Sequence, residues 1–196
     1  MIFDKPKAFQ VRAGQRAQHV SLPDLGVAPS GTEAPKPLMV DKSTDAFFTP
    51  PEAASDLIAA AHPGKWQRWL EPSAGSGSLI TALQDYEPEL KEIVAVERYL
   101  PFIPHLEQFG ENVSVHAEDF LDLLPEELGL FDGIVMNPPF HRGAAQKHVE
   151  HALRFLKPGG QFAAIVPSTF KGGAVVQDLP SGTFSATPVS TKIIIW

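Results

Sequence analysis

The segment Asn137-Pro138-Pro139-Phe140 combines residue types that can bind a planar amino group. It directly follows the apolar run over residues 131–136, and a proline pair cannot continue a strand ladder, so the strand must end there. The Asn137 side chain can accept from and donate to an NH2 group, the Pro138 carbonyl offers a second acceptor, and the Phe140 ring offers a stacking surface. An ordinary strand-ending turn uses the same residue types, so the surrounding residues must decide between the two interpretations.

A second polar segment opens with Glu71 and continues through two glycines to residue 78. The glycines let the backbone pass close to a ligand, and the start of a helix supplies free N–H groups. The dinucleotide fingerprint fails because Ile80 stands where its last glycine belongs, and no Gly-Lys-Ser/Thr occurs. A carboxylate beside the loop attracts an ammonium group and repels phosphate, so the sequence predicts a cationic rather than a phosphate-bearing ligand.

Two further acids follow apolar runs. Glu97 comes after residues 93–96, where it can accept hydrogen bonds from two ribose hydroxyls, unless it is simply an exposed acid at a strand end. The pair Asp119-Phe120 supplies an acceptor for an amino group and an aromatic face for adenine. Together with Glu71, these residues predict a pocket for an adenosine that carries a cationic amino-acid tail and no phosphates.

Short apolar strands alternate with helical patterns along the chain, which predicts a doubly wound, parallel α/β sheet. The expected strands are residues 66–70, 93–96, 113–116, 133–136 and 162–166, with two more over 174–176 and 191–196. The expected helices are residues 51–61, 79–86, 101–109 and 144–156, the last one stopping at a Lys-Pro-Gly-Gly signal over 157–160. Open α/β sheets bind ligands at the carboxyl ends of their strands, so the polar residues above should meet there.

The composition limits the class of protein. With 196 residues and 43% hydrophobic content, the chain suits one domain over residues 44–196 and an extended or partly disordered arm over residues 1–43. The absence of cysteine excludes disulfides, thiolate zinc sites and cysteine nucleophiles, and no bound metal is implied. No signal sequence or membrane-span pattern occurs, so we expect a cytoplasmic protein with no membrane partner.

The charge is unevenly distributed. A net charge of -7 argues against indiscriminate binding to nucleic acid, yet residues 141–157 contain four cations and one acid. These cations are Arg142, Lys147, Arg154 and Lys157. They form either a phosphate-contacting surface or a solvated helix face. His148 and His151 lie one turn apart on the same helix, but without further ligands we expect them at the surface or facing phosphate rather than on zinc.

Taken in order, these segments resemble the class I S-adenosylmethionine-dependent methyltransferases, in particular amino-methyltransferases with an Asn-Pro-Pro-Phe/Tyr motif, over residues 47–196. They are most similar to small phage or mobile-element members of the N6-adenine DNA methyltransferase type. The resemblance implies a Rossmann-like sheet of order 3-2-1-4-5-7-6 with an antiparallel last strand, and S-adenosylmethionine as cofactor. It implies catalytic roles for Asn137, Pro138 and Phe140. The cofactor-binding residues that it implies are Phe48, Thr49, Glu71, Ser73, Ala74, Gly75, Gly77, Glu97, Asp119 and Phe120.

Residues next to the motif, namely Pro139, His141 and Arg142, are expected to contact the substrate. The motif is shared by DNA adenine-N6, RNA adenine-N6 or guanine-N2, and protein glutamine-N5 enzymes, and we favour adenine N6 in DNA. Only residues 169–189 leave room for target recognition, so a partner subunit, a homodimer or the basic arm could contribute it. The helix usual between strands five and six is reduced to residues 170–173, which questions that sheet edge. A non-catalytic cofactor-binding protein is the third interpretation.

Overall fold

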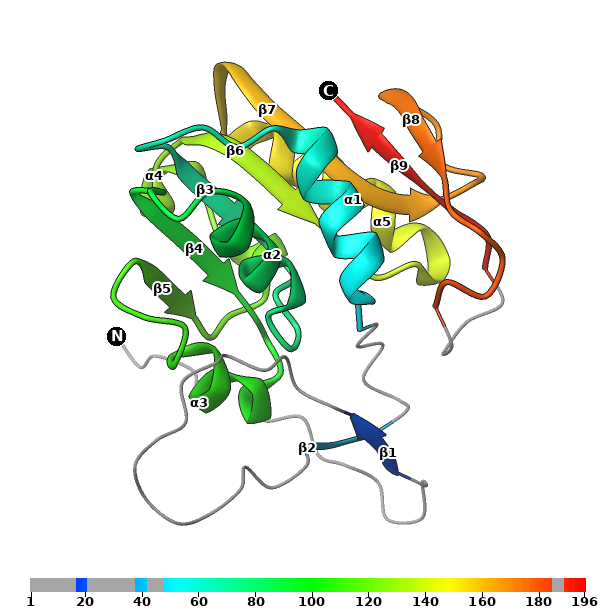
Figure 1. Ribbon diagram of the computed structural model, residues 1–196, viewed down its shortest axis with the longest axis horizontal. Helices are drawn as coiled ribbons and strands as arrows, with labels where there is room; N and C mark the ends of the chain where they lie inside the picture. The colour runs from blue at the N-terminus through cyan, green and yellow to red at the C-terminus, as the bar shows by residue number, and fades with distance from the viewer. Residues whose placement is uncertain (1–16, 21–37, 42–47, 185–188) are drawn as a thin grey trace, which may run out of the picture.

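The computed structural model describes residues 17–20, 38–41, 48–184 and 189–196. Its main body is a seven-stranded sheet with helices on both faces (Figure 1). The strands are β3 (Arg68–Glu71), β4 (Glu92–Val96), β5 (Val113–His116), β6 (Phe131–Met136), β7 (Leu156–Pro167), β8 (Ala174–Asp178) and β9 (Thr191–Ile195). They run in the order β5-β4-β3-β6-β7-β9-β8, and β9 is antiparallel to both of its neighbours. This arrangement confirms the predicted order 3-2-1-4-5-7-6.

The helices cover the two faces of this sheet. The α-helices are α1 (Pro51–Ala61), α2 (Ser78–Tyr86), α3 (Ile103–Leu106), α4 (Pro125–Leu128) and α5 (Ala144–Ala152). Short 3-10 turns are η2 (Leu100–Phe102), η3 (Phe120–Asp122), η4 (His141–Gly143) and η5 (Leu153–Phe155). Separately, β1 (Ala17–Val20) and β2 (Leu38–Asp41) form a two-stranded antiparallel sheet within the segment predicted as an arm.

Alternating side chains of the central strands divide the core into two layers. Trp69 and Ile93 belong to the cluster that includes α1 and α2, whereas Leu70 and Val94 belong to the cluster that includes α5. Gly133 lets the Trp69 indole lie directly on β6, because a Cβ at Gly133 would stand 2.3 Å from that ring. Both faces of the sheet are therefore buried, as a parallel sheet requires.

The parallel strands β3, β4, β5 and β6 all end at one edge of the sheet. The polar residues singled out above stand at or just after these ends: Glu71 on β3, Glu97 after β4, Asp119 beyond β5 and Asn137 after β6. At the start of the domain, Pro51 occupies the first turn of α1, where its missing N–H costs nothing, and the preceding Phe48 and Thr49 lead into this helix. The topology thus gathers the predicted site at a single edge.

Two predicted elements differ from the structure. The helix expected over residues 101–109 is divided into η2 and the four-residue α3, because Pro101 and Pro104 provide no N–H for a regular helix and the Gln108 side chain instead donates to the Pro104 carbonyl at 2.7 Å. The stop signal over 157–160 lies within β7 rather than in a loop. Gly160 allows this, since a Cβ there would meet the Asp132 carbonyl oxygen at 2.9 Å.

The far edge of the sheet forms although its connection is short. Residues 168–173 contain turns but no helix, and β8 pairs with β9 directly after them. The shortened connection therefore does not prevent this edge from forming, because the antiparallel ladder of β9 supplies the hydrogen bonds on which β8 depends. Within the described ranges, no helix is both long and apolar enough to cross a membrane.

Candidate active site

The glycine-bearing loop between β3 and α2 is held by two carboxylates. The Ser73 amide donates to Glu71 Oε1 at 2.9 Å, and the Gly75 amide donates to Glu97 Oε2 at 2.7 Å. Gly75 (φ 54°) and Gly77 (φ 83°) adopt left-handed conformations that favour glycine. A Cβ at Gly75 would meet no atom closer than 3.9 Å, so the space above this backbone is open to a ligand.

Glu71 is fully buried at the end of β3, with 0% of its surface exposed. Its Oε1 accepts from the Ser73 amide, but its Oε2 is buried without a hydrogen-bond partner, as is the neighbouring Ser73 Oγ. Burial raises the pKa of Glu71 to about 8, helped by the nearby charge of Glu97 and opposed by the Ser73 amide. A buried, unsatisfied carboxylate oxygen is costly, and a bound cation would remove that cost.

Glu97 is oriented by the backbone on both sides. Its Oε2 accepts from the Gly75 amide, and its Oε1 accepts from the Tyr99 amide at 2.6 Å. Burial raises the pKa of Glu97, and these two amide bonds oppose that rise. The carboxylate therefore couples the end of β4 to the glycine loop of β3, and is more than the exposed acid that the sequence left as an alternative.

Asn137 is fixed by a contact between segments 88 residues apart. Its Nδ2 donates to Thr49 Oγ1 at 3.0 Å, and its Oδ1 is buried without a partner. Only 7% of each residue is exposed. One N–H of the amide is bound to Thr49 while Oδ1 has no partner, so the buried amide offers an acceptor that suits an N–H group. The sequence predicted both residues as part of the site, but not this contact.

The rest of the motif forms the wall next to Asn137. Pro138 is buried, while Pro139 and Phe140 are half-buried. The Phe140 ring meets Phe184 edge-on at a centroid distance of 6.0 Å, and it packs against both core clusters. Phe48 meets Phe102 edge-on at 5.9 Å, on the side of α1 and η2. These rings are thus seated in the core and leave only part of each surface open.

Asp119 and Phe120 have different surroundings. Asp119 accepts from the Leu121 amide at 3.1 Å and from Arg98 Nη1 at 3.3 Å, at the surface. Phe120 is only 3% exposed, and its ring packs edge-on against His151 at 4.8 Å and near Phe155 at 5.2 Å. A ring that is buried in this way has no open face for adenine, so Phe120 packs in the core and the predicted stacking surface is not exposed.

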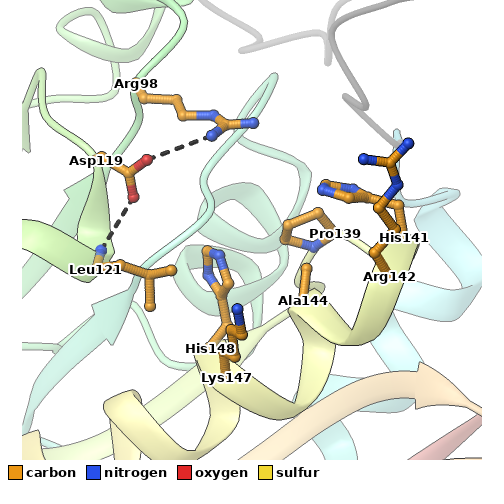
Figure 2. Close-up of a pocket in the computed structure, with 9 residues that line it drawn as sticks. All are labelled: Arg98, Asp119, Leu121, Pro139, His141, Arg142, Ala144, Lys147 and His148. Atoms are coloured by element: carbon orange, nitrogen blue, oxygen red, sulfur yellow. Dashed lines mark hydrogen bonds and ion pairs between the residues drawn. The ribbon is translucent and has the colours of Figure 1, made fainter.

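A cavity of about 310 Å³ lies between the ends of β4 and β5 and the start of α5 (Figure 2). Its lining residues are Arg98, Asp119, Leu121, Pro139, His141, Arg142, Ala144, Lys147 and His148. The predicted residues Asp119, Pro139, His141 and Arg142 are therefore brought together. Arg98 and Leu121 were not predicted, although Arg98 directly follows Glu97, a position that could have been recognised. Lys147 and His148 were predicted only as possible phosphate-facing residues.

The basic stretch after the motif divides in two. Arg142 and Lys147 line the cavity, whereas Arg154 contacts His151 and Lys157 pairs with Asp132 at 2.7 Å. Asp132 belongs to the opposite end of β6, so the second pair of cations does not reach the site. Only the first two are placed to contact a substrate at the cavity.

The two histidines of α5 do not act together. Burial lowers the pKa of His148 to about 4, against the opposing effect of Asp119, and its ring lines the cavity. The His151 ring nitrogen Nε2 instead lies 3.0 Å from the Leu123 carbonyl oxygen. Among the described residues, no group of three or more His, Cys, Asp or Glu side chains is arranged to hold a metal ion.

With this site defined, the class of protein follows. Residues 52–179 match the family model described as "Methyltransferase small domain", which is well over half of the chain. The chain belongs to this family of class I methyltransferases. This is a family of S-adenosylmethionine-dependent methyltransferases, as the resemblance implied.

Among curated proteins, the chain is 30% identical over 116 residues to the ribosomal RNA small subunit methyltransferase C of Shewanella sediminis (strain HAW-EB3), a match that covers 56% of this chain and 34% of that protein. The chain thus spans about a third of that relative.

Among solved structures, the methyltransferase subunit of a type I restriction-modification system from Streptococcus thermophilus has a TM-score of 0.64 at 22% identity, with 76% of this chain and 44% of that chain covered. The 23S rRNA methyltransferase ErmE has a TM-score of 0.61 at 16% identity, with 76% and 68% covered. At these identities the likeness shows the fold.

Proposed function

We propose that this methyltransferase acts on the exocyclic amino nitrogen of a nucleobase, with adenine N6 in DNA as the first candidate. The observation that carries this proposal is the buried Asn137 Oδ1, which has no partner while Asn137 Nδ2 donates to Thr49 Oγ1. An exocyclic amine has N–H groups to donate, so it complements this acceptor. A hydroxyl would complement it less completely, since it has only one proton to share between Asn137 and the Pro138 carbonyl.

The cofactor S-adenosylmethionine supplies a methyl group on a sulfonium, and the unsatisfied atoms of the site fit its other parts. Glu71 Oε2 and Ser73 Oγ are buried acceptors without partners, beside the open backbone at Gly75, and they suit a cationic amino-acid end. In this proposal Glu97, which is held by two backbone amides, accepts from the ribose hydroxyls, and Asp119, which lines the cavity, accepts from the adenine amino group. Ala74, Gly77, Phe48 and Thr49 would complete the walls.

The protein's part in the reaction is positioning. The lone pair of an exocyclic amine is delocalised into the ring, which makes the nitrogen a poor nucleophile. Hydrogen bonds from its two protons to Asn137 Oδ1 and to the Pro138 carbonyl favour a pyramidal nitrogen whose lone pair is free to attack. The half-buried Phe140 ring, seated against Phe184, holds the base by stacking. The nitrogen becomes acidic only as the new bond forms, so no strong general base is needed.

The acceptor atoms are deep, which bears on how a nucleic acid reaches them. Asn137 and Pro138 are both buried, so a base stacked within a duplex cannot contact them. A duplex substrate must therefore turn its target base out of the helix, whereas a single strand needs no such step. The segment between β7 and β9 is short, so we expect loose target choice or recognition by a partner subunit.

A methyl acceptor in RNA is the second candidate. It is favoured by the curated relative, whose printed name is a ribosomal RNA methyltransferase and which shares 30% identity over 116 residues. The same hydrogen-bond arrangement serves an amino group in either nucleic acid. A glutamine side chain in a polypeptide presents a similar amide nitrogen. The cations that line the cavity nevertheless favour a nucleic acid, because every nucleotide carries a negative charge.

The test is mass spectrometry of nucleosides from the DNA and RNA of cells that lack their own adenine methylation. The intact chain is compared with Asn137→Ala, the matched control for cofactor binding without transfer. We expect N6-methyladenine in DNA only with the intact chain. A new methylated nucleoside in RNA alone would transfer the proposal to RNA, and methyl label in polypeptide with none in either nucleic acid would refute it.

A further inference from the structure

The cavity beside the Asn-Pro-Pro-Phe motif carries an excess of positive charge. Three permanent cations line it, Arg98, Arg142 and Lys147, against the single carboxylate Asp119. The chain as a whole has a net charge of -7. A local positive field on an acidic protein concentrates anions at that place, so its position next to the acceptor site is informative.

The three cations are not equivalent. Arg98 Nη1 lies 3.3 Å from Asp119 Oδ2, so these two groups largely balance each other across one wall of the cavity. In the described part of the chain, Arg142 and Lys147 form no ion pair and no side-chain hydrogen bond, and both are exposed. His148 adds no charge near neutral pH, because burial lowers its pKa to about 4. Two uncompensated cations therefore remain, both on the α5 side.

Both cations are set close to the motif. Arg142 lies two residues after Phe140 and adopts φ 44° and ψ 36°, a left-handed conformation that is unfavourable for a residue with a side chain. It precedes Gly143, also left-handed, and Figure 2 shows it beside His141 on the turn that leads into α5. Lys147 lies on the first turns of α5, facing the same cavity. The pair thus lines the same cavity as Pro139 of the motif.

Two uncompensated cations at this cavity favour an anionic ligand. The one anionic group of the cofactor is its amino-acid carboxylate, which adjoins the ammonium that we assign to Glu71 and the glycine loop, so it does not account for two cations on the α5 side of the cavity. A phosphodiester adjoining the target nucleotide does, since Arg pairs with two phosphate oxygens and Lys acts as a point charge. We propose that Arg142 and Lys147 form a phosphodiester-binding site that holds the nucleic-acid backbone next to the target base. The inference rests on the proposed function, because it takes a nucleic acid as substrate.

The experiment measures the salt dependence of binding of the full chain to fluorescent single-stranded DNA and RNA of random sequence. The variants are the intact chain, the double substitution Arg142→Gln with Lys147→Gln, and Lys91→Gln. Lys91 is an exposed cation at the opposite end of β4, so it is the matched control for removal of a charge. For a single strand, each phosphate that the protein neutralises contributes about 0.7 to the slope of log K against log salt. We expect the slope of the double variant to be smaller by about 1.4 and that of the control to be unchanged.

Cofactor affinity and thermal unfolding of the double variant should equal those of the intact chain, which shows that the substitutions act on phosphate binding and not on the fold. An unchanged slope in the double variant, an equal change in Lys91→Gln, or no binding by the intact chain would each overturn the inference. A smaller slope in the double variant alone supports it. Whichever of DNA and RNA shows the larger change is then the nucleic acid whose backbone the site binds. If that change occurs while neither nucleic acid is ever methylated, the binding site stands and the proposed function fails.

Discussion

The buried part and the exposed part of the site use polar groups in opposite ways. In the buried part, Glu71 and Asn137 each keep an acceptor oxygen without a partner. In the exposed part, Arg142 and Lys147 are cations at the surface of the cavity. A buried group has no water to replace a missing partner, whereas an exposed charge is solvated and screened by salt. Substitutions should therefore have large effects in the buried part and small, salt-dependent effects in the exposed part.

The largest effect is expected at Asn137. Asn137→Ala removes the acceptor that orients the amine, and we expect the rate of methyl transfer at saturating cofactor to fall about 10²–10³-fold, as when one preorganised partner of a transition state is removed. Cofactor affinity should stay nearly unchanged. Asn137→Asp is the matched control, because it keeps an acceptor oxygen and should retain more activity than Ala. Single-turnover kinetics and calorimetry measure the two quantities.

Glu97→Ala should show the reverse order and separate the roles within the buried region. It removes the acceptor for the Gly75 and Tyr99 amides, so cofactor affinity should weaken first. If Asn137→Ala and Glu97→Ala lose cofactor binding equally, the assignment of one residue to the acceptor and the other to the cofactor is wrong.

The second effect concerns pH. Burial raises the pKa of Glu71 from 4.5 to about 8, so the folded chain without cofactor favours the protonated group. Its contribution to the free energy of unfolding is fully present below pH 4.5 and is lost as pH rises through about 8. A bound ammonium favours the carboxylate instead, so cofactor affinity should increase with pH up to about 8, by at most about tenfold per unit.

Glu71→Gln provides the control for this prediction, since it keeps the shape of the side chain and cannot titrate. The difference between the intact chain and Glu71→Gln isolates this group from Glu97, whose pKa is raised as well. Melting temperature without cofactor, and calorimetric affinity with it, are measured across the same pH range. A difference between the two proteins that does not vary with pH would contradict the account.

A smaller effect is expected from Thr49→Val. The substitution keeps the volume of the side chain and removes the acceptor for Asn137 Nδ2, so the amide loses one hydrogen bond worth about 1 kcal/mol. Methyl transfer should slow roughly fivefold, while Thr49→Ser, which keeps the hydroxyl, should stay near the intact chain. An effect of Thr49→Val on cofactor affinity alone would show that Thr49 serves the cofactor and does not orient Asn137.

The smallest effect is expected in the exposed part of the site, where a substitution of Arg142 should increase stability. Arg142→Gly relieves a left-handed conformation that costs a residue with a side chain about 1 kcal/mol, so stability should rise by up to that amount, or about 2–4 °C in melting temperature for a chain of this size. Differential scanning calorimetry measures the change. Arg142→Ala keeps the strain and loses the charge, so it should show no such gain; equal stability of the two variants would remove the strain argument.

The buried half of the site was largely predictable from the sequence. Glu71, Glu97 and Asn137 each follow an apolar strand, and the ends of parallel strands share one edge of the sheet, so a one-dimensional pattern was enough to bring them together. The order of the strands came from the resemblance to a family and is confirmed. These features depend on the alternation of strand and helix patterns, which the sequence shows directly, and on the order of the strands, which the family resemblance implied.

What the sequence missed depends on distant contacts. The Thr49–Asn137 hydrogen bond joins segments 88 residues apart, and nothing in either segment indicates it. Phe120 was expected to face a ligand, yet α5 covers it through His151. The helix α5 and the turn before it carry Arg142 and Lys147 to the cavity, while Arg154 and Lys157 lie away from it, a division that depends on how α5 packs. The direction of each side chain depends on how α5 packs against the sheet, and the spacing of apolar residues in the sequence does not specify that packing.

The most direct test of the central claim compares acceptors that differ by one amino group. Random-sequence DNA oligonucleotides containing adenine are incubated with the protein and methyl-labelled cofactor, beside oligonucleotides in which purine, lacking the N6 amino group, replaces adenine. The account predicts label in the first set, none in the second, and initial labelling of the first set that is about 10²–10³-fold slower with Asn137→Ala. Equal labelling of the two sets, or labelling by Asn137→Ala at the rate of the intact chain, would contradict it.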